Sequence, residues 1–189
     1  PKSYDPVSLN MNGVKVTCKE EIANLFNDFF KGKVEDLGQR IDPTMKEDPE
    51  KRLAEKMRGN LRTFKLRPVA ESEVARAIRE LKPKKSVGHD DMSQELLKSV
   101  SSIITFPLKS IINRSIISGI FPDRWKHSKV IPLYKKGDKS DVSNYRPVSI
   151  LPAASKVLES VVLKQLTKYF EENKFLPNNQ HGFRRGRST

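Results

Sequence analysis

The sequence contains one cysteine, Cys18, in 189 residues. A single cysteine excludes an internal disulfide and is typical of a reducing compartment, so we expect a nuclear or cytoplasmic protein in which Cys18 is half-buried and apolar. No apolar run approaches the roughly 20 residues of a membrane-spanning helix. Residues 1–10 have neither the basic head nor the apolar stretch of a signal peptide. Since the first residue is not Met, we expect a piece of a longer polypeptide.

The sequence also lacks the common signatures of a catalytic centre. His89, His127 and His181 have no metal-ligand spacing, and no Ser–His or Cys–His pairing, phosphate-binding loop or dinucleotide fingerprint is recognisable. Asp90 and Asp91 are better explained by a turn and a helix N-cap. Catalysis by two metal ions needs carboxylates that converge from separate elements on ions about 3.5–4 Å apart. We therefore predict no catalytic and no metal-binding residue in this chain.

Positive charge is abundant and unevenly spread. The chain has 36 Lys and Arg against 23 Asp and Glu, a net charge of +13. Residues 126–189 carry 13 of these cations against 5 acidic residues, whereas the first 125 residues carry 23 against 18. Basic charge gathered in one stretch is expected of a polyanion binder, although membrane surfaces and acidic proteins attract it too. Charge alone therefore leaves nucleic acid as one of several candidate partners.

Apolar spacing predicts many helices and few strands, and so an α+β domain in which helices predominate. The expected helices are residues 17–37, 48–61, 71–81, 93–101, 107–118 and 153–173, and the expected extended segments are residues 128–134 and 144–151. Pro107 is placed in the first turn of its helix, and Gly119 at the C-terminal stop. The Phe-rich stripe of residues 17–37 is interpreted as packing surface rather than a base-stacking platform.

Three basic loops carry the strongest chemical signal. They contain Lys135 and Lys136 in a predicted hairpin turn, Arg146 in the extended segment after it, and Arg184, Arg185 and Arg187 interleaved with Gly182 and Gly186. Arg offers phosphate a planar fork and Lys a mobile point charge, while glycine lets the backbone approach a ligand closely. The loops therefore predict a polyphosphate or a nucleic-acid backbone as ligand. Solvated surface charge is the alternative for each loop taken separately.

Four ordered motifs give the sequence a specific resemblance. They are Trp125-Lys126, Pro132 to Gly137 (PLYKKG), Asn144 to Ser149 (NYRPVS) and Gln180 to Thr189 (QHGFRRGRST). The series closely resembles the N-terminal fingers region of non-LTR retrotransposon (LINE-like) reverse transcriptases, strongly over residues 84–189 and weakly over 17–83. Residues 85–98 resemble a short Gly-Pro-Asp-Gly-Ile block ahead of the fingers, from which His89, Asp91 and Met92 depart. Residues 17–40 look like the linker between an endonuclease domain and the polymerase.

The resemblance implies an incomplete right-hand polymerase fold: a helical extension over residues 1–83, then the fingers and the start of the palm over 84–189. It implies that Arg146 contacts the triphosphate of the incoming nucleotide, and that Lys135 and Lys136 lie near those phosphates or the template. The loop with Gly182, Arg184, Arg185, Gly186 and Arg187 would lie against the template. Tyr145 and Phe183 would fix these backbones by packing.

RNA template, DNA primer and dNTP are the partners that the resemblance implies for the parent enzyme, and Mg²⁺ is its cofactor. No membrane partner and no particular oligomeric state are implied. Members of the family carry the metal-binding aspartates of the palm after the Gly-Arg-Ser-Thr block, and this sequence ends at Thr189. We therefore expect the chain by itself to bind no Mg²⁺ and to be inactive as a polymerase.

Three other functions remain open at this stage. The main alternative is a stand-alone, truncated or domesticated nucleic-acid-binding protein without polymerase activity. A group II intron maturase is another, although the Asn-Tyr-Arg-Pro-x-Ser form speaks against it. The third is an interaction protein that docks through residues 17–37.

Overall fold

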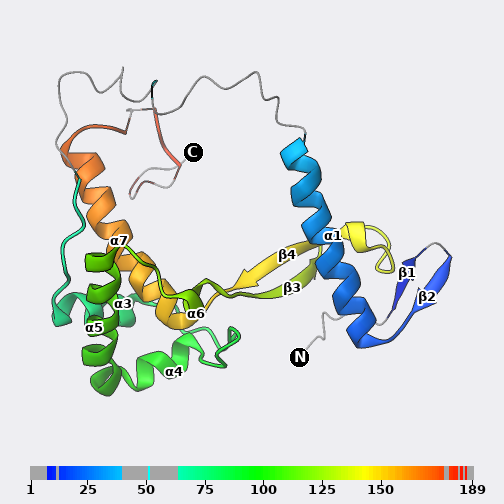
Figure 1. The fold of residues 1–189 in the computed structure, drawn as a ribbon, viewed down its shortest axis with the longest axis horizontal. Helices are drawn as coiled ribbons and strands as arrows, with labels where there is room; N and C mark the ends of the chain where they lie inside the picture. Colours follow the sequence, from blue (N-terminus) through cyan, green and yellow to red (C-terminus); the bar gives the residue numbers. More distant parts are fainter. Residues whose placement is uncertain are drawn as a thin grey trace. The chain divides into compact units, whose positions relative to one another are not determined.

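The computed structural model describes residues 8–11, 13–39, 51, 64–176, 179–182, 184 and 186. The chain forms two compact units (Figure 1). Unit 1 consists of Pro1–Arg62 and Val130–Ser149, and unit 2 of Thr63–Lys129 and Ile150–Thr189. The expected helix at 48–61 lies outside the described residues apart from residue 51. The division of the chain into residues 1–83 and 84–189 stays a prediction.

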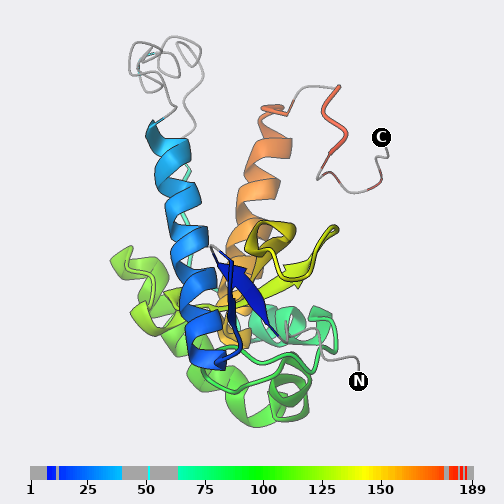
Figure 2. The ribbon, with the colours of Figure 1, turned by 90° about the vertical axis from the view of Figure 1, so that its right-hand side faces the viewer.

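Unit 1 combines two small sheets with one long helix. Its described elements are β1 (Leu9–Met11), β2 (Val14–Val16), α1 (Lys19–Gln39), β3 (Lys129–Tyr134), the 3-10 helix η2 (Val142–Asn144) and β4 (Tyr145–Ile150). Strands β1 and β2 are antiparallel, with Leu9 opposite Val16, and the hairpin lies beside α1 (Figure 2). β3 pairs with β4 in a second two-stranded sheet, so both predicted extended segments are confirmed.

A small aromatic core holds unit 1 together. Its buried residues are Leu9, Ile22, Phe26 and Tyr145. The Phe26 ring meets Tyr145 edge-on at 4.9 Å between centroids and stacks on Phe30 at 5.7 Å. The stripe of α1 is therefore packing surface in the first half of the helix, as predicted. Farther along, Val34 is 70% exposed and Leu37 is 62% exposed.

Cys18 is exposed, so the prediction of a half-buried thiol was wrong. The residue stands directly before α1, and its carbonyl accepts the first helical hydrogen bond, from the amide of Ile22. The buried face of α1 begins only at Ile22, so Cys18 lies ahead of the packed surface.

Unit 2 is built from helices. They are α3 (Glu71–Glu80), α4 (Gln94–Ser99), α5 (Ser101–Ser118), α6 (Asp123–Lys126) and α7 (Ala153–Glu172). α3 packs against both α5 and α7, and the three lie side by side in Figure 1. None of the helices that the structure describes is long and apolar enough to cross a membrane.

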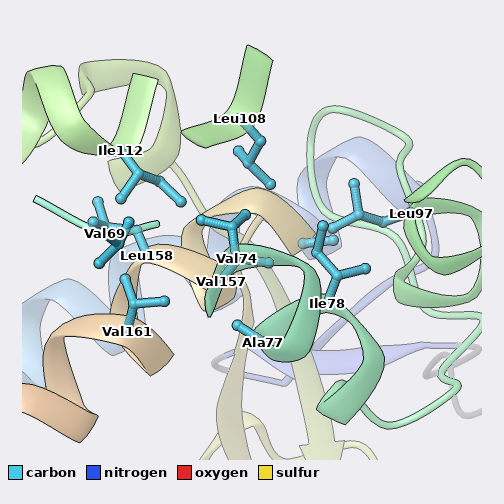
Figure 3. Packing of buried hydrophobic residues seen from close by; sticks show 11 residues of the cluster. Val69, Val74, Ala77, Ile78, Leu97, Leu108, Ile112, Val157, Leu158 and Val161 are labelled. Carbon is cyan, nitrogen blue, oxygen red and sulfur yellow. The ribbon is translucent and has the colours of Figure 1, made fainter. Parts of the chain in front are cut away.

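The core of unit 2 draws side chains from four helices. Figure 3 shows them converging: Val74, Ala77 and Ile78 of α3, Leu97 of α4, Leu108 and Ile112 of α5, Val157, Leu158 and Val161 of α7, with Val69 ahead of α3. On α3 and α7 these positions follow the three- and four-residue steps of a helical face. The predicted helices at 71–81 and 153–173, and their apolar faces, are therefore confirmed.

The start predicted for α5 was wrong. The helix begins at Ser101, and Pro107 lies inside it, where the proline has no N–H to donate to the preceding turn. Ile104, Leu108 and Ile112 continue one packed face across the proline, and this burial outweighs the lost hydrogen bond. The predicted stop is confirmed, since Gly119 ends the helix with φ at 69° in the left-handed region.

Helices predominate and each sheet has two strands among the described residues, which agrees with the α+β class predicted from the sequence.

Candidate nucleic-acid interface

The connection between β3 and β4 presents a group of lysines to solvent. Lys135 and Lys136 follow β3 directly, Lys139 comes three residues later, and all three are exposed. Lys135 and Lys136 form no ion pair with any residue that the structure describes. Two adjacent positive charges therefore remain available to an anionic ligand.

Hydrogen bonds from both flanking strands fix the backbone of this connection. The amide of Lys135 donates to the carbonyl of Asn144 at 2.8 Å, which continues the pairing of β3 with β4. The Tyr134 hydroxyl donates to the Gly137 carbonyl at 2.5 Å, and the Tyr145 hydroxyl donates to the Lys139 carbonyl at 2.8 Å. The lysines are thus carried by an ordered loop, which lowers the entropy that binding would cost.

Gly137 is the position at which the loop requires glycine. Its φ is 93°, and a Cβ built there would stand 2.7 Å from Nδ2 of Asn144. That amide donates to the Asp138 carbonyl at 2.9 Å, so the Asn144 side chain is not free to move aside. The glycine of the PLYKKG motif therefore has a steric role as well as a conformational one.

The acidic side chains of the loop are turned into its own backbone. The Asp138 carboxylate accepts hydrogen bonds from the amide of Ser140 at 2.9 Å and from its hydroxyl at 2.8 Å. The amide bond is the main cause that lowers the pKa of Asp138 below its ordinary value. Asp141 and Ser143 repeat the arrangement, with both distances at 2.8 Å. Negative charge in the loop thus fixes turns and forms no ion pair with the neighbouring lysines.

Arg146 is the second residue of β4 and is exposed. The residue before it, Tyr145, is only 5% exposed and packs against Phe26, and burial raises the pKa of its hydroxyl. Because neighbouring side chains of a strand point to opposite faces, Arg146 projects from the face away from this core. Arg146 forms no ion pair with a described residue. Unit 1 thus carries Lys135 and Lys136 in the loop after β3 and Arg146 on the paired strand β4.

The third basic loop belongs to unit 2. Gly182, Arg184 and Gly186 are described there, whereas Phe183, Arg185 and Arg187 lie outside the described residues. The side-chain amide of Gln180 donates to the Gly182 carbonyl at 3.1 Å, and φ of Gly186 is 74°, so this loop also uses glycine in the left-handed region.

The residues that shape the hairpin were not singled out from the sequence. Asn144 and Asp138 hold the loop, and Lys139 adds a third cation whose Nζ lies 5.6 Å from the Tyr134 ring centroid. The repeated Asp-x-Ser spacing, at Asp138–Ser140 and Asp141–Ser143, is the signal that could have revealed two side-chain-closed turns.

No cluster of three or more His, Cys, Asp or Glu that could hold a metal ion occurs in the part of the chain that the structure describes. Asp90 accepts a hydrogen bond from the amide of Met92 at 3.3 Å, and Asp91 has φ at 53°, so the pair forms a turn as predicted. The N-cap of α4 is Ser93, whose hydroxyl accepts from the amide of Leu96, so the helix N-cap expected of Asp90 and Asp91 was wrong. His89 and His127 lie with ring centroids 5.6 Å apart. These residues do not fit a Mg²⁺ site.

Curated relatives of this chain are polymerases of mobile elements. It is 32% identical over 125 residues to the "Probable RNA-directed DNA polymerase from transposon BS" of Drosophila melanogaster, covering 66% of this chain and 14% of the relative. It is 32% identical over 120 residues to the "RNA-directed DNA polymerase from mobile element jockey" of the same organism, covering 63% and 13%. No protein-family model matches the chain.

A third relative is similar over the entire chain. The "Retrovirus-related Pol polyprotein from type-1 retrotransposable element R1" of Bradysia coprophila is 27% identical over 191 residues, covering 100% of this chain and 17% of the relative. The chain therefore spans between 13% and 17% of the length of these three proteins. The resemblance inferred from the four sequence motifs is confirmed: the chain is similar to a segment of RNA-directed DNA polymerases of non-LTR retrotransposons.

Proposed function

We propose that this chain is the part of an RNA-directed DNA polymerase that holds template, primer and incoming nucleotide through basic loops. The observation that carries the proposal is the β3–β4 hairpin. Its backbone is fixed by both strands, and its carboxylates accept hydrogen bonds from Ser140 and Ser143. Lys135, Lys136 and Arg146 are exposed without ion pairs to described residues. Cations on an ordered loop suit phosphate groups, because little conformational entropy is lost when they bind.

Each cation of the hairpin has a distinct role in this proposal. Arg146 binds the triphosphate of the incoming nucleotide, where its planar fork can engage two phosphate oxygens. Lys135 and Lys136 act as mobile charges on the same phosphates or on the template. The loop with Gly182, Arg184, Arg185, Gly186 and Arg187 lies against the template strand. The fingers and the start of the palm of a right-hand polymerase are the fold that accommodates these roles.

The division of work follows from the chemistry. Cations that neutralise phosphate charge bind and orient substrates without taking part in bond formation. This chain contributes binding, positioning and charge neutralisation.

The proposal is tested by the salt dependence of binding to a labelled RNA template annealed to a DNA primer, measured by fluorescence anisotropy. Each phosphate contact adds about 0.9 to the slope of log K against log salt for a duplex. Replacing both lysines, Lys135→Ala with Lys136→Ala, is expected to weaken binding and to lower the slope by roughly 1–2.

The matched control removes the same charge elsewhere in unit 1. Lys19 and Lys31 lie on α1 and are exposed, so Lys19→Ala with Lys31→Ala changes the net charge equally. This control is expected to leave the slope close to that of the unaltered chain. Salt-insensitive binding, or the same loss in both double variants, would contradict the proposal.

A further inference from the structure

Unit 2 contains a cation-rich groove that includes none of the residues assigned above. It lies between residues 64–67, α3 and α7 and has a volume of about 390 Å³. Five cations line it: Lys65, Arg67, Arg76, Lys164 and Lys168. Glu73 and Glu172 are its acidic lining residues, and Phe64 and Tyr169 are its aromatic ones.

The walls of the groove are held in place by reciprocal hydrogen bonds. The amide of Arg67 donates to Oε1 of Gln165 at 2.9 Å, and Nε2 of Gln165 donates back to the Arg67 carbonyl at 3.0 Å. Asn113 makes the same pair of bonds to Val69, at 2.7 and 3.0 Å. The segment before α3 is thereby tied to α7 and to α5. The groove is therefore preformed, and a ligand would not have to order it.

Some of the cations are already neutralised inside the protein. The guanidinium of Arg67 binds both oxygens of Glu73, at 2.9 and 2.7 Å. The hydrogen bond from Arg67 and a second from the Ala70 amide lower the pKa of Glu73 to about 2. Lys164 pairs with Glu80 at 2.5 Å. These contacts fix the walls of the groove, and they leave Arg67 and Lys164 with little net charge for a ligand.

The remaining cations are available to an anion. Lys65 and Arg76 are exposed and form no ion pair with a residue that the structure describes. Arg76 helps to lower the pKa of Glu73 through its charge, but the oxygens of that carboxylate are held by Arg67 and the Ala70 amide. Lys168 has a loose pair with Glu172 at 3.7 Å, and its side chain is 75% exposed. An exposed pair of this kind contributes little and is readily exchanged for a phosphate.

Aromatic rings complete the groove. The centroids of Phe64 and Tyr169 lie 5.0 Å apart, and both residues are half-buried, so each ring is held by packing and keeps part of its surface exposed. Phe175 supports Tyr169 from another side at 5.5 Å. Cations that follow a chain of phosphates beside an aromatic surface for stacking are the combination that binds single-stranded nucleic acid without sequence preference.

We propose that this groove binds a single-stranded nucleic acid, with phosphates on Lys65, Arg76 and Lys168 and a base against Phe64 and Tyr169. The inference deepens the proposed function, because it rests on nucleic acid being the ligand of the chain. It assigns a second contact surface on unit 2, made by residues that the hairpin does not supply.

The test measures binding of the 189-residue chain to labelled oligouridine and oligothymidine over a series of salt concentrations. Arg76→Gln is compared with Arg79→Gln, a matched control on the same helix. Both arginines are exposed, but Arg79 lines a separate hollow between α3 and α5. Arg76→Gln is expected to lower the slope of log K against log salt by about 0.7, the value for one phosphate of a single strand. Arg79→Gln is expected to leave it unchanged.

A second variant separates stacking from charge. Phe64→Leu removes a ring but keeps an apolar side chain, and it is expected to weaken binding roughly fivefold or more without changing the salt slope. Circular dichroism confirms that each variant is folded. Binding of either oligonucleotide with these two responses supports the inference, and a preference between them identifies RNA or DNA as the strand.

Three results would each overturn the inference, and they can be distinguished from one another. Identical behaviour of the Arg76 and Arg79 variants, in a chain that still binds template–primer duplex, would overturn the groove alone. Equal competition by polyglutamate, together with no effect of Phe64→Leu, would assign the groove to acidic peptides and overturn it as well. Failure of the unaltered chain to bind any nucleic acid would overturn the proposed function and the groove together.

Discussion

Gly137 offers the sharpest test of how the hairpin is built. In Gly137→Ala the new Cβ would stand 2.7 Å from Nδ2 of Asn144, and the backbone would have to keep φ at 93°. The left-handed conformation costs an L-residue about 1–2 kcal/mol. Displacing Asn144 breaks its hydrogen bond to the Asp138 carbonyl, which costs about 1 kcal/mol more. We expect unit 1 to lose roughly 2–3 kcal/mol of stability from these two causes together.

Gly13→Ala is the matched control. Gly13 lies in the same unit with φ at 84°, and a Cβ built there meets no atom within 4 Å. It should therefore cost only the conformational part, about 1–2 kcal/mol. The loss of unfolded-chain entropy on replacing glycine applies equally to both variants and cancels in the comparison.

Hydrogen exchange of the α1 amides under increasing denaturant is the assay, because both hairpins pack in the unit that contains this helix. A double-mutant cycle with Asn144→Ala isolates the clash, since Gly137→Ala should cost less once Asn144 has been shortened. Equal costs for the Gly137 and Gly13 variants, or no coupling between Gly137 and Asn144, would refute the steric reasoning.

Three further predictions follow from the packing and the charges. Ile112→Ala should destabilise unit 2 by about 2–5 kcal/mol because Ile112 is 0% exposed. Ile117 lies on the same helix and is 74% exposed, so Ile117→Ala should change stability by less than about 0.5 kcal/mol. Chemical denaturation checks both variants, and similar losses would contradict the core assignment. The pKa of Glu73 is lowered from 4.5 to about 2 in the folded chain, so its contribution to stability is complete above pH 4.5 and is lost as the pH falls toward 2. Glu73→Gln should flatten the pH dependence of the unfolding midpoint between these two pH values. An unchanged dependence would refute the stabilising role of the ion pair between Glu73 and Arg67. Arg146→Ala, placed in a polypeptide that includes the catalytic carboxylates, should raise KM for dNTP more than it raises the dissociation constant for template–primer; equal effects in steady-state kinetics and in anisotropy would remove the assigned role.

The helical parts of the fold were predictable because local spacing encodes them. Val74, Ala77 and Ile78 follow one helical face in the sequence and are buried together in the structure. Pro107 misled the prediction because a local start signal was weighed without the burial of Ile104 and Leu108 on either side of it. The prediction for Cys18 was wrong because its burial depends on where the buried face of α1 begins, and the composition does not give that position.

The chemistry of the hairpin was predictable only in part. Lys135, Lys136 and Arg146 were identified by residue type and motif, and the structure places the two lysines in the loop directly after β3 and Arg146 on β4. The grouping of residues 130–149 with the N-terminal helix is a long-range arrangement that local periodicity does not carry. The same limit applies to the groove of unit 2, since Lys65, Arg76 and Lys168 come from three separate segments.

Photochemical crosslinking tests the central claim most directly. The 189-residue chain would be bound to an RNA template–DNA primer duplex that carries photoreactive bases, irradiated, digested and examined by mass spectrometry. If the hairpin grips nucleic acid, crosslinked peptides will include the stretch from Lys135 to Arg146, and the yield there will fall in the Lys135→Ala, Lys136→Ala variant. Crosslinks confined to other parts of the chain, with none in this stretch, would contradict the account.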